Sequence, residues 1–424
     1  METIREHLFS EQLKLEFRMN DKDFTRDRVL TFSITLLFML NFLRKSLVLE
    51  IFNFVKNIKI KSFSKSAFVQ CRKKINPLVF KELSQVLTAE FYTDNEGSVK
   101  LWKGFRLLAV DGSRITLPDT KELRSVYGAT KNQTKTSVVQ ARMSALYDVL
   151  NNYVIDGKMA ALSTGEKSLA IEHLQYAQSD DLVIYDRGYP SFDLIYEHLQ
   201  LDIDCLIRVK LSFSDATKKF IASGKYSNVI DIKPGKNAPL RNKSYSKNDS
   251  IKVRLIRVDL PDGTIELLMT TLLCSKTYTT GIFKELYFKR WGVEIYYDEL
   301  KNKIKVELFS GYSDRCIQQD FYAALFISNI QTLMVTELNE ELQENQMTQY
   351  KYIVNNNLSY GFLKDRIVEL LLSNKDIDTV LLELKDIFRR HLIPIRPNRS
   401  FLRHHDKYRN RVKPKVPKNQ RDAL

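Results

Sequence analysis

The sequence contains little cysteine, glycine or proline, and each shortage excludes a class of protein. Its four cysteines stand far apart among 424 residues, with no Cys-x-x-Cys pair, which excludes a zinc ribbon and a dense disulfide framework. Fourteen Gly and ten Pro, together with 11% aromatic residues, exclude collagen-like and disordered chains. We therefore expect a packed globular protein with reduced thiols.

Long apolar runs are also missing. The longest, residues 29–43, is interrupted by polar residues and falls short of the roughly 20 apolar residues that a membrane span needs. It predicts a buried helix instead. The first residues are acidic and polar, whereas a signal peptide is basic and then apolar, so we expect a cytoplasmic protein.

Positive charge is abundant but unevenly placed. The net charge is +15, and residues 44–81 hold ten Lys and Arg against one acid. Residues 389–424 hold twelve against two acids, so these two segments account for all of the excess. Two basic segments around a slightly acidic middle suit a protein that binds a phosphate backbone. A solvated helix face and a solubilising tail would give the same pattern.

Hydrophobic periodicity divides the chain into regions. Residues 1 to about 85 have apolar residues at helical spacing, including a basic helix at 66–74. Strands are expected at 105–110, 143–150, 153–159, 182–185 and 205–209, with helices at 163–178 and 191–199. Three strands followed by helix, strand, helix and strand predict a mixed α/β sheet.

A second β-rich stretch, residues 211–274, contains a hairpin signal. An alternating strand that starts at Ile251 runs into the turn Pro261-Asp262-Gly263 and a second apolar run. The pattern then becomes helical from about residue 280, and a proline-containing basic tail closes the chain. The sequence therefore predicts a sheet protein with helices at both ends.

Two strands of the first region each end in an aspartate. The runs Leu-Leu-Ala-Val-Asp111-Gly and Leu-Val-Ile-Tyr-Asp186-Arg-Gly-Tyr place a carboxylate at the strand end, followed by a glycine. Side by side, two carboxylates repel unless a cation lies between them, and hard oxygen ligands suit Mg²⁺ or Mn²⁺. Either aspartate alone is more often a turn or helix cap.

A third polar group follows at 287–301. At about 100° per residue, Tyr287, Arg290, Glu294 and Lys301 would share one narrow helix face, pointing to roughly 0°, −60°, −20° and −40°. One acid beside a phenol and two cations suits a metal site next to phosphates. An amphipathic surface helix with salt bridges is the alternative. Asp298, near +20°, is not excluded as the third carboxylate.

These residues resemble the DDE transposases of the insertion-sequence-four type, over about residues 62–311. The most specific element is the spacing Y-x2-R-x3-E-x6-K, matched by Tyr287, Arg290, Glu294 and Lys301. The resemblance implies an RNase H-like mixed-sheet core interrupted by a β-rich insertion domain, with a helical N-terminal domain and a helical, basic C-terminal region. It also implies a bacterial protein that associates with the nucleoid.

The resemblance assigns roles residue by residue. Asp111, Asp186 and Glu294 would be the catalytic, metal-binding triad for two Mg²⁺ or Mn²⁺ ions. Tyr287, Arg290 and Lys301 would contact DNA phosphates, and Trp291, which at about +40° could equally pack on the sheet, would hold a displaced base. Further DNA contacts are expected from the basic helix, at Arg72, Lys73 and Lys74.

The implied function is transposition of an insertion sequence. The protein would bind terminal inverted repeats and target DNA as a homodimer, and would catalyse metal-dependent strand cleavage and strand transfer. The expected domains are 1–90 (DNA-binding), 100–210 (core), 211–275 (insertion), 276–345 (core) and 346–424 (C-terminal helices and tail). Two alternatives are an RNase H-like nuclease without strand transfer and a domesticated DNA-binding protein without chemistry.

Overall fold

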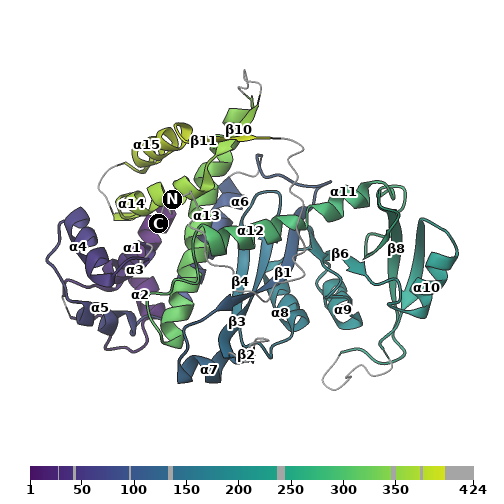
Figure 1. Ribbon diagram of the computed structural model, residues 1–424, viewed down its shortest axis with the longest axis horizontal. Coiled ribbons are helices and arrows are strands. Elements are labelled where there is room, and N and C mark those ends of the chain that lie inside the picture. The colour runs from purple at the N-terminus through teal and green to yellow at the C-terminus, as the bar shows by residue number, and fades with distance from the viewer. Residues whose placement is uncertain are drawn as a thin grey trace. The chain divides into compact units, whose positions relative to one another are not determined.

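The computed structural model describes residues 1–26, 28–41, 44–94, 97–131, 137–235, 244–344, 350–372 and 376–396. They form a mixed α/β protein with a nine-stranded sheet, a two-stranded sheet and helices (Figure 1). Packing divides them into two units. We name residues 1–94, 115–141 and 298–424 the helical unit, and residues 95–114 and 142–297 the sheet unit, and describe each separately.

The helical unit contains most of the helices. Its helices are α1 (Glu2–Phe9), α2 (Glu11–Phe17), α3 (Phe32–Leu40), α4 (Leu47–Ile58), α5 (Lys65–Arg72), α6 (Val79–Asp94), α7 (Lys121–Tyr127), α13 (Asp314–Glu344), α14 (Asn356–Leu372) and α15 (Ile377–Arg389). Its short strands are β2 (Ala129–Lys131), β10 (Lys351–Val354) and β11 (Leu392–Ile395), of which β10 and β11 pair antiparallel.

Local sequence explains where these helices start. The side chains of Ser10, Thr31 and Ser64 each accept a hydrogen bond from a backbone N–H of the following turn, which caps α2, α3 and α5. The apolar run at 29–43 was predicted to be a buried helix, and α3 confirms this, since seven of its residues are buried. The predicted helices of residues 1 to about 85 and the basic helix near 66–74, now α5, are also confirmed.

Helix α13 is the longest and lies at the centre of the helical unit. In the part of the chain that the structure describes, it is the one helix long and apolar enough to cross a membrane, and 83% of its most apolar window is buried inside the protein. Its apolar composition is that of a core helix, because it packs against α3, α6 and α15.

The sheet unit holds the strands and the helices between them. Its elements are β4 (Val154–Ala160), α8 (Glu166–His173), a 3₁₀ turn (Leu174–Tyr176), β5 (Asp181–Tyr185), α9 (Phe192–Gln200), β6 (Asp204–Val209), α10 (Asp215–Ala222), β7 (Ser227–Ile232), β8 (Ile251–Asp259), β9 (Ile265–Thr270) and α11 (Ile282–Phe288). Strands β1 (Arg106–Thr116) and β3 (Ser137–Asp148) and helix α12 (Trp291–Asn302) start in one unit and end in the other.

The large sheet is mixed. Its order is β2-β3-β1-β5-β6-β9-β8-β7, with β4 paired to β3. Strands β1, β5 and β6 run parallel, whereas β4 pairs antiparallel with β3 and β9 with β6. The chain order β1, β3, β4, α8, β5, α9 and β6 confirms the predicted three strands followed by helix, strand, helix and strand.

A buried ion pair fixes the register of the two central strands. Arg106 begins β1 opposite Asp181 at the start of β5, and its guanidinium makes two hydrogen bonds of 2.7 and 2.6 Å to that carboxylate. All residues of β5 and the first five of β1 are buried, as is usual for strands covered on both faces. A slip by one residue would break the ion pair, so the far ends of the strands are also fixed.

The predicted hairpin is present as β8 and β9. Leu260 and Thr264 close its turn, where Gly263 has a φ of 82° that favours glycine. Strand β9 pairs with β6, so this β-rich stretch continues the large sheet. The boundaries of an insertion domain, like the other domain boundaries, stay a prediction.

Candidate active site

Asp111 and Asp186 lie at the same edge of the sheet unit. Val110 and Tyr185 are register partners in the parallel pair β1 and β5, and each aspartate is the next residue along its strand. Each carboxylate accepts a hydrogen bond from the N–H that follows it, at 2.8 Å from Gly112 and 2.6 Å from Arg187. The two aspartates are therefore neighbours, as the sequence pattern predicted, but the strand end expected at Asp111 is wrong, because β1 continues to Thr116.

Buried side chains hold the backbone at Asp111. Its carbonyl oxygen accepts hydrogen bonds from the Tyr297 hydroxyl at 2.6 Å and from the Ser144 hydroxyl at 3.4 Å. Ser144 also contacts His173, whose second ring nitrogen lies 2.7 Å from a carboxylate oxygen of Asp156. This Asp, His and Ser chain is buried, so it supports Asp111 and does not form a solvent-facing nucleophile.

The signature residues do not lie on one helix, which corrects the prediction. Helix α11 ends at Phe288, and α12 begins at Trp291, after a turn at Lys289 and Arg290. The break is closed by hydrogen bonds from Gly292 N–H to Lys289 O and from Val293 N–H to Arg290 O. Angles counted along one helix from Tyr287 therefore do not apply to residues after this break. Glu294 stands in the first turn of α12, where a carboxylate is favoured by the helix dipole.

Arg290 joins two of the three predicted acids. Its Nη2 lies 2.6 Å from Glu294 Oε1, and its Nη1 lies 3.7 Å from Asp111 Oδ2. Its guanidinium also lies over the rings of Tyr287 and Trp291, at 5.9 and 5.3 Å from their centroids. The side chain is nearly buried, so it is fixed by these four groups.

The three acids act on one another electrostatically. Burial raises the pKa of Asp111 to about 6, the Gly112 N–H and Arg290 oppose this, and the charges of Glu294 and Asp186 add to it. A carboxyl group held among like charges is stabilised in its ionised form by a bound cation. The structure thus brings Asp111, Asp186 and Glu294 into one electrostatic cluster.

The donor set fits a hard divalent cation. Among the described residues, no three His, Cys, Asp or Glu side chains already converge at metal-binding distance. At this edge the guanidinium of Arg290 contacts both Glu294 and Asp111. Carboxylate oxygens are nonetheless the ligands that Mg²⁺ and Mn²⁺ prefer. The pKa of Asp111 is raised mainly by burial, with a smaller contribution from the charges of Glu294 and Asp186.

The remaining signature residues differ in exposure. Tyr287 is buried, and its hydroxyl has no hydrogen-bond partner among the described residues. Trp291 is 41% exposed, so its ring faces solvent as well as Arg290. Lys301 lies seven residues after Glu294 on α12, in the helical unit, where burial lowers its pKa and Glu307 opposes the change. Asp298, the alternative third acid, is exposed and accepts a hydrogen bond from Asn302.

The prediction that Arg72 contacts DNA is wrong for the chain as folded. Arg72 is buried in the helical unit, where it donates to Gln319 at 3.0 Å and Ser310 at 2.7 Å and pairs with Asp320 at 3.1 Å. A guanidinium with these partners supports the fold. Its neighbours Lys73 and Lys74 fit a DNA contact better. Lys73 is exposed, and Lys74, which pairs with Asp23 at 3.4 Å, is half-buried.

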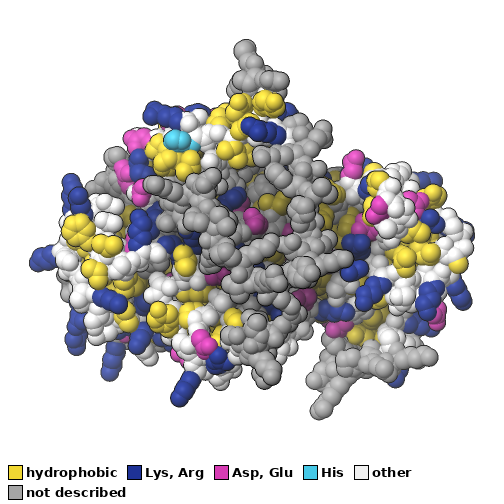
Figure 2. Space-filling model, viewed as in Figure 1, with side chains coloured by type: hydrophobic (Ala, Val, Ile, Leu, Met, Phe, Trp, Pro, Cys, Tyr) yellow, Lys and Arg dark blue, Asp and Glu magenta, His cyan; other side chains and the backbone are white. Residues whose placement is uncertain are grey.

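The first basic segment keeps an exposed cationic face. Arg44 is used internally, because it donates to the carbonyl oxygens of Ile304 and Leu308. Exposed cations remain on and around α4 and α5, where Figure 2 shows a gathering of Lys and Arg side chains; they are Lys45, Lys56, Lys59, Lys61, Lys65 and Lys73. Most of the second basic segment, residues 397–424, lies outside the described residues.

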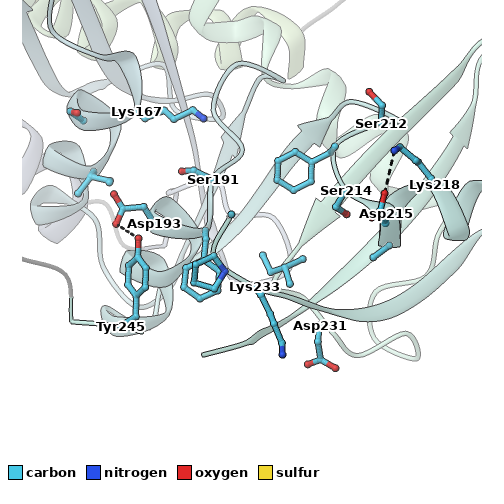
Figure 3. A pocket seen from close by; sticks show the side chains of 18 residues that line it. Lys167, Ser191, Asp193, Ser212, Ser214, Asp215, Lys218, Asp231, Lys233 and Tyr245 are labelled. Carbon is cyan, nitrogen blue, oxygen red and sulfur yellow. Dashed lines mark hydrogen bonds and ion pairs between the residues drawn. The ribbon is translucent and has the colours of Figure 1, made fainter. Parts of the chain in front are cut away.

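The sheet unit also contains a hollow of about 1010 Å³. Figure 3 shows Lys167 on one side of the hollow and Ser191, which caps α9. The Lys167 ammonium group donates to Pro190 O at 2.8 Å. Three Lys and three Asp line the hollow together with serines and apolar residues. Their formal charges cancel, so the hollow is not a strongly cationic surface.

Sequence reasoning missed three residues beside the acids. They are Tyr189, in the loop that follows Asp186, and two charged residues that act on its pKa, Glu166 and Arg142. Glu166 pairs with Arg142. The Asp-Arg-Gly-Tyr strand end already contained Tyr189, but nothing local showed which way its side chain pointed. Glu166 and Arg142 carry no motif, and only the sheet brings them here.

Comparisons with known proteins give the family of the chain. A model of the family described as transposase DDE domain matches residues 102–330. Transposase InsG of insertion sequence element IS4, from Escherichia coli K12, is 22% identical over 251 residues, which is 57% of this chain and 55% of the relative. The match therefore spans just over half of each chain.

The similar solved structures that were found include the piggyBac transposase synaptic complex with hairpin DNA, at 9% identity and a TM-score of 0.44, covering 92% of this chain and 80% of that one. The family model alone covers more than half of the 424 residues and includes Asp111, Asp186 and Glu294. The chain therefore belongs to the family of proteins with a transposase DDE domain.

Proposed function

We propose that this protein is the DNA transposase of an insertion sequence, which cuts DNA at the terminal inverted repeats and joins the freed ends to target DNA. One observation carries the proposal. Asp111, Asp186 and Glu294, far apart in sequence, lie in the sheet unit close enough for two of them to raise the pKa of the third. Family membership gives the reaction class.

We further propose that the sheet unit is an RNase H-like core. Strands β1, β5 and β6 are parallel, β3 lies beside β1, and β4 pairs with β3, with helices α8 and α9 between the later strands. Two of the acids directly follow register partners of neighbouring parallel strands, and α12 supplies the third. This order supports the assignment, because the acids then meet at one edge.

Asp111, Asp186 and Glu294 are the residues that would hold Mg²⁺ or Mn²⁺, as two ions in each active site. Such ions supply an activated water and stabilise the leaving oxygen in phosphodiester cleavage. The chain's own residues do the rest. The Gly112 and Arg187 N–H groups orient two carboxylates, and Tyr297 fixes the backbone at Asp111.

The cationic and aromatic residues would position the DNA strand. Arg290 pairs with Glu294 and Asp111, and a phosphate group competes well for a guanidinium. We therefore propose that Arg290, Tyr287 and Lys301 contact phosphates. The exposed ring of Trp291 is free to stack on a base that leaves the duplex.

DNA binding also needs a surface away from the acids. We propose that the exposed cations around α4 and α5, Lys73 and Lys74 among them, contact the inverted repeat. Holding two element ends together requires two copies of the chain, so we propose a homodimer on DNA. This activity places the protein with bacterial DNA in the cytoplasm.

The test is cleavage of a duplex that carries the element's own flanking inverted repeat, with Mg²⁺ or Mn²⁺. We expect nicking at the repeat boundary and joined products with target DNA. Asp111→Ala, Asp186→Ala and Glu294→Ala should lose both, whereas Asp298→Ala, an exposed acid one turn further on, should keep them.

Each other outcome has a definite meaning. Cleavage without joined products would identify a nuclease, and repeat binding without cleavage in the wild type would identify a domesticated DNA-binding protein. Activity that survives Glu294→Ala but is lost in Asp298→Ala would move the third acid by one turn of α12.

A further inference from the structure

Tyr189 is a buried residue whose hydroxyl makes no hydrogen bond to any described residue. Its side chain is 2% exposed, and its hydroxyl oxygen has no hydrogen-bond partner among the described residues. The ring itself packs 5.4 Å from that of Tyr185, and the Tyr189 N–H donates to Asp186 O at 3.1 Å. Since a buried polar group without a partner is costly, this hydroxyl points to a ligand.

Acidic groups surround that hydroxyl. Burial raises the pKa of Tyr189, and the charges of Asp111, Glu166 and Asp186 raise it further, while Arg142 opposes them. These carboxylates are near enough to act on the phenol, yet none of them accepts a hydrogen bond from it. The hydroxyl therefore lies near these acids without bonding to any of them.

Glu166 lies close to the backbone that follows both aspartates. A Cβ at Gly112 would lie 3.3 Å from Glu166 Cγ, and one at Gly188 would lie 4.0 Å from Glu166 Oε2. Glu166 thus packs against the glycine that follows each of the two aspartates. Its charge is matched by Arg142, and the one guanidinium of Arg290 is shared between Asp111 and Glu294. The acids near Tyr189 therefore still outnumber the cations that pair with them.

The negative charge around the Tyr189 hydroxyl favours a cation as the ligand. An anion such as a free phosphate would meet carboxylates on several sides, so it is disfavoured. A hydrated divalent cation suits both the carboxylates and the hydroxyl, because the carboxylates can bind the ion while one of its water molecules forms a hydrogen bond with the hydroxyl. Mg²⁺ in particular keeps several of its waters when it binds protein carboxylates.

We propose that Tyr189 is a positioning residue of the cation site, with its hydroxyl hydrogen-bonded to a water molecule of the divalent ion that Asp111 and Asp186 hold. This rests on the proposed function, because it requires that the acids bind a divalent ion. It adds a residue outside the Tyr287, Arg290, Glu294 and Lys301 signature. Partners of this kind typically change metal affinity about 10- to 100-fold.

The test is a Mn²⁺ titration of the full chain without DNA, with free Mn²⁺ measured by electron paramagnetic resonance. We expect Tyr189→Phe to weaken Mn²⁺ binding about 10-fold and Asp111→Ala to abolish it. The matched control is Tyr153→Phe, a buried tyrosine of the same unit near Asp148, which should bind as the wild type does.

Unfolding by urea separates this role from a structural one. Phenylalanine keeps the ring contact with Tyr185 and removes only an unpaired hydroxyl, so metal-free Tyr189→Phe should be at least as stable as the wild type. Wild-type affinity in Tyr189→Phe, with binding lost in Asp111→Ala, would overturn this inference and leave the proposed function standing. A wild type that binds no Mn²⁺ would overturn both.

Discussion

At the scale of single residues, His198 shows how burial makes stability depend on pH. It lies on α9 with both ring nitrogens in use, since Nδ1 is 3.1 Å from Ile203 O and Nε2 is 2.8 Å from the Tyr185 hydroxyl. A carbonyl oxygen can only accept, so Nδ1 carries the proton and Nε2 accepts from Tyr185. A second proton therefore has no favourable position in the folded protein.

The pKa of His198 gives the sign of the effect. Burial lowers it from 6.5 to about 4, against the opposing hydrogen bond to Ile203. Between these values the unfolded chain binds the proton and the folded chain does not, so stability is lost as the pH falls from about 6.5 towards 4. We expect the free energy of unfolding to fall by about 2 kcal/mol between pH 7 and 5 from this residue alone.

Urea unfolding of the wild type and His198→Gln at several pH values measures this. The variant should lose less stability over the same range, because its side chain does not titrate. His391→Gln, which changes an exposed histidine, is the control and should follow the wild type. Parallel curves for wild type and His198→Gln would contradict the assignment.

At the scale of elements, the end of α5 places a residue that holds the fold next to a residue that we propose to contact DNA. Arg72 and Lys73 are adjacent at its C-terminal end, yet one is buried in an ion pair with Asp320 and the other is exposed. We expect Arg72→Met to lower the free energy of unfolding by about 3 kcal/mol, because it leaves a buried carboxylate unpaired.

Lys73→Ala should act on DNA binding and leave stability within about 0.5 kcal/mol of the wild type. Loss of one phosphate contact lowers the slope of log affinity against log salt by about one. Urea unfolding and binding to an inverted-repeat duplex at several salt concentrations measure both effects. An unchanged salt slope would remove Lys73 from the DNA interface.

Elements also show what could be predicted from sequence. The buried runs before Asp111 and Asp186 were predictable because a buried strand is a local apolar run. The strand end expected at Asp111 was wrong, since β1 continues to Thr116 beside β3, and only the folded sheet shows this. The break between α11 and α12 was not, since its hydrogen bonds to Lys289 O and Arg290 O carry no sequence signal. Arg72 was misassigned because its partner, Asp320, is 248 residues away.

At the scale of the whole molecule, positive charge is concentrated in two segments of the sequence, which we proposed to contact DNA. The net charge is +15, and the basic residues concentrate at 44–81 and 389–424. In the first segment, internal pairing removes Arg44 and Arg72 from the surface and leaves an exposed set around α4 and α5. Arg389 at the start of the second is likewise paired, with Glu341 at 2.5 Å.

The distribution predicts how each segment contributes to binding. Every phosphate that a Lys or Arg neutralises releases a counterion, so the slope of log affinity against log salt counts such contacts. A chain truncated after Arg396 keeps α15 and β11 but loses the rest of the basic tail. If the tail lies on DNA, the truncated chain should bind the inverted repeat more weakly than the full chain. Its slope of log affinity against log salt should also be smaller.

Truncation and substitution together locate the electrostatic contacts. In the truncated chain, Lys73→Ala should still lower the slope by about one, because contacts at well-separated sites add. Equal slopes for the full and truncated chains would show that the tail does not touch phosphate, and the exposed lysines around α4 and α5 would then have to supply the salt dependence themselves.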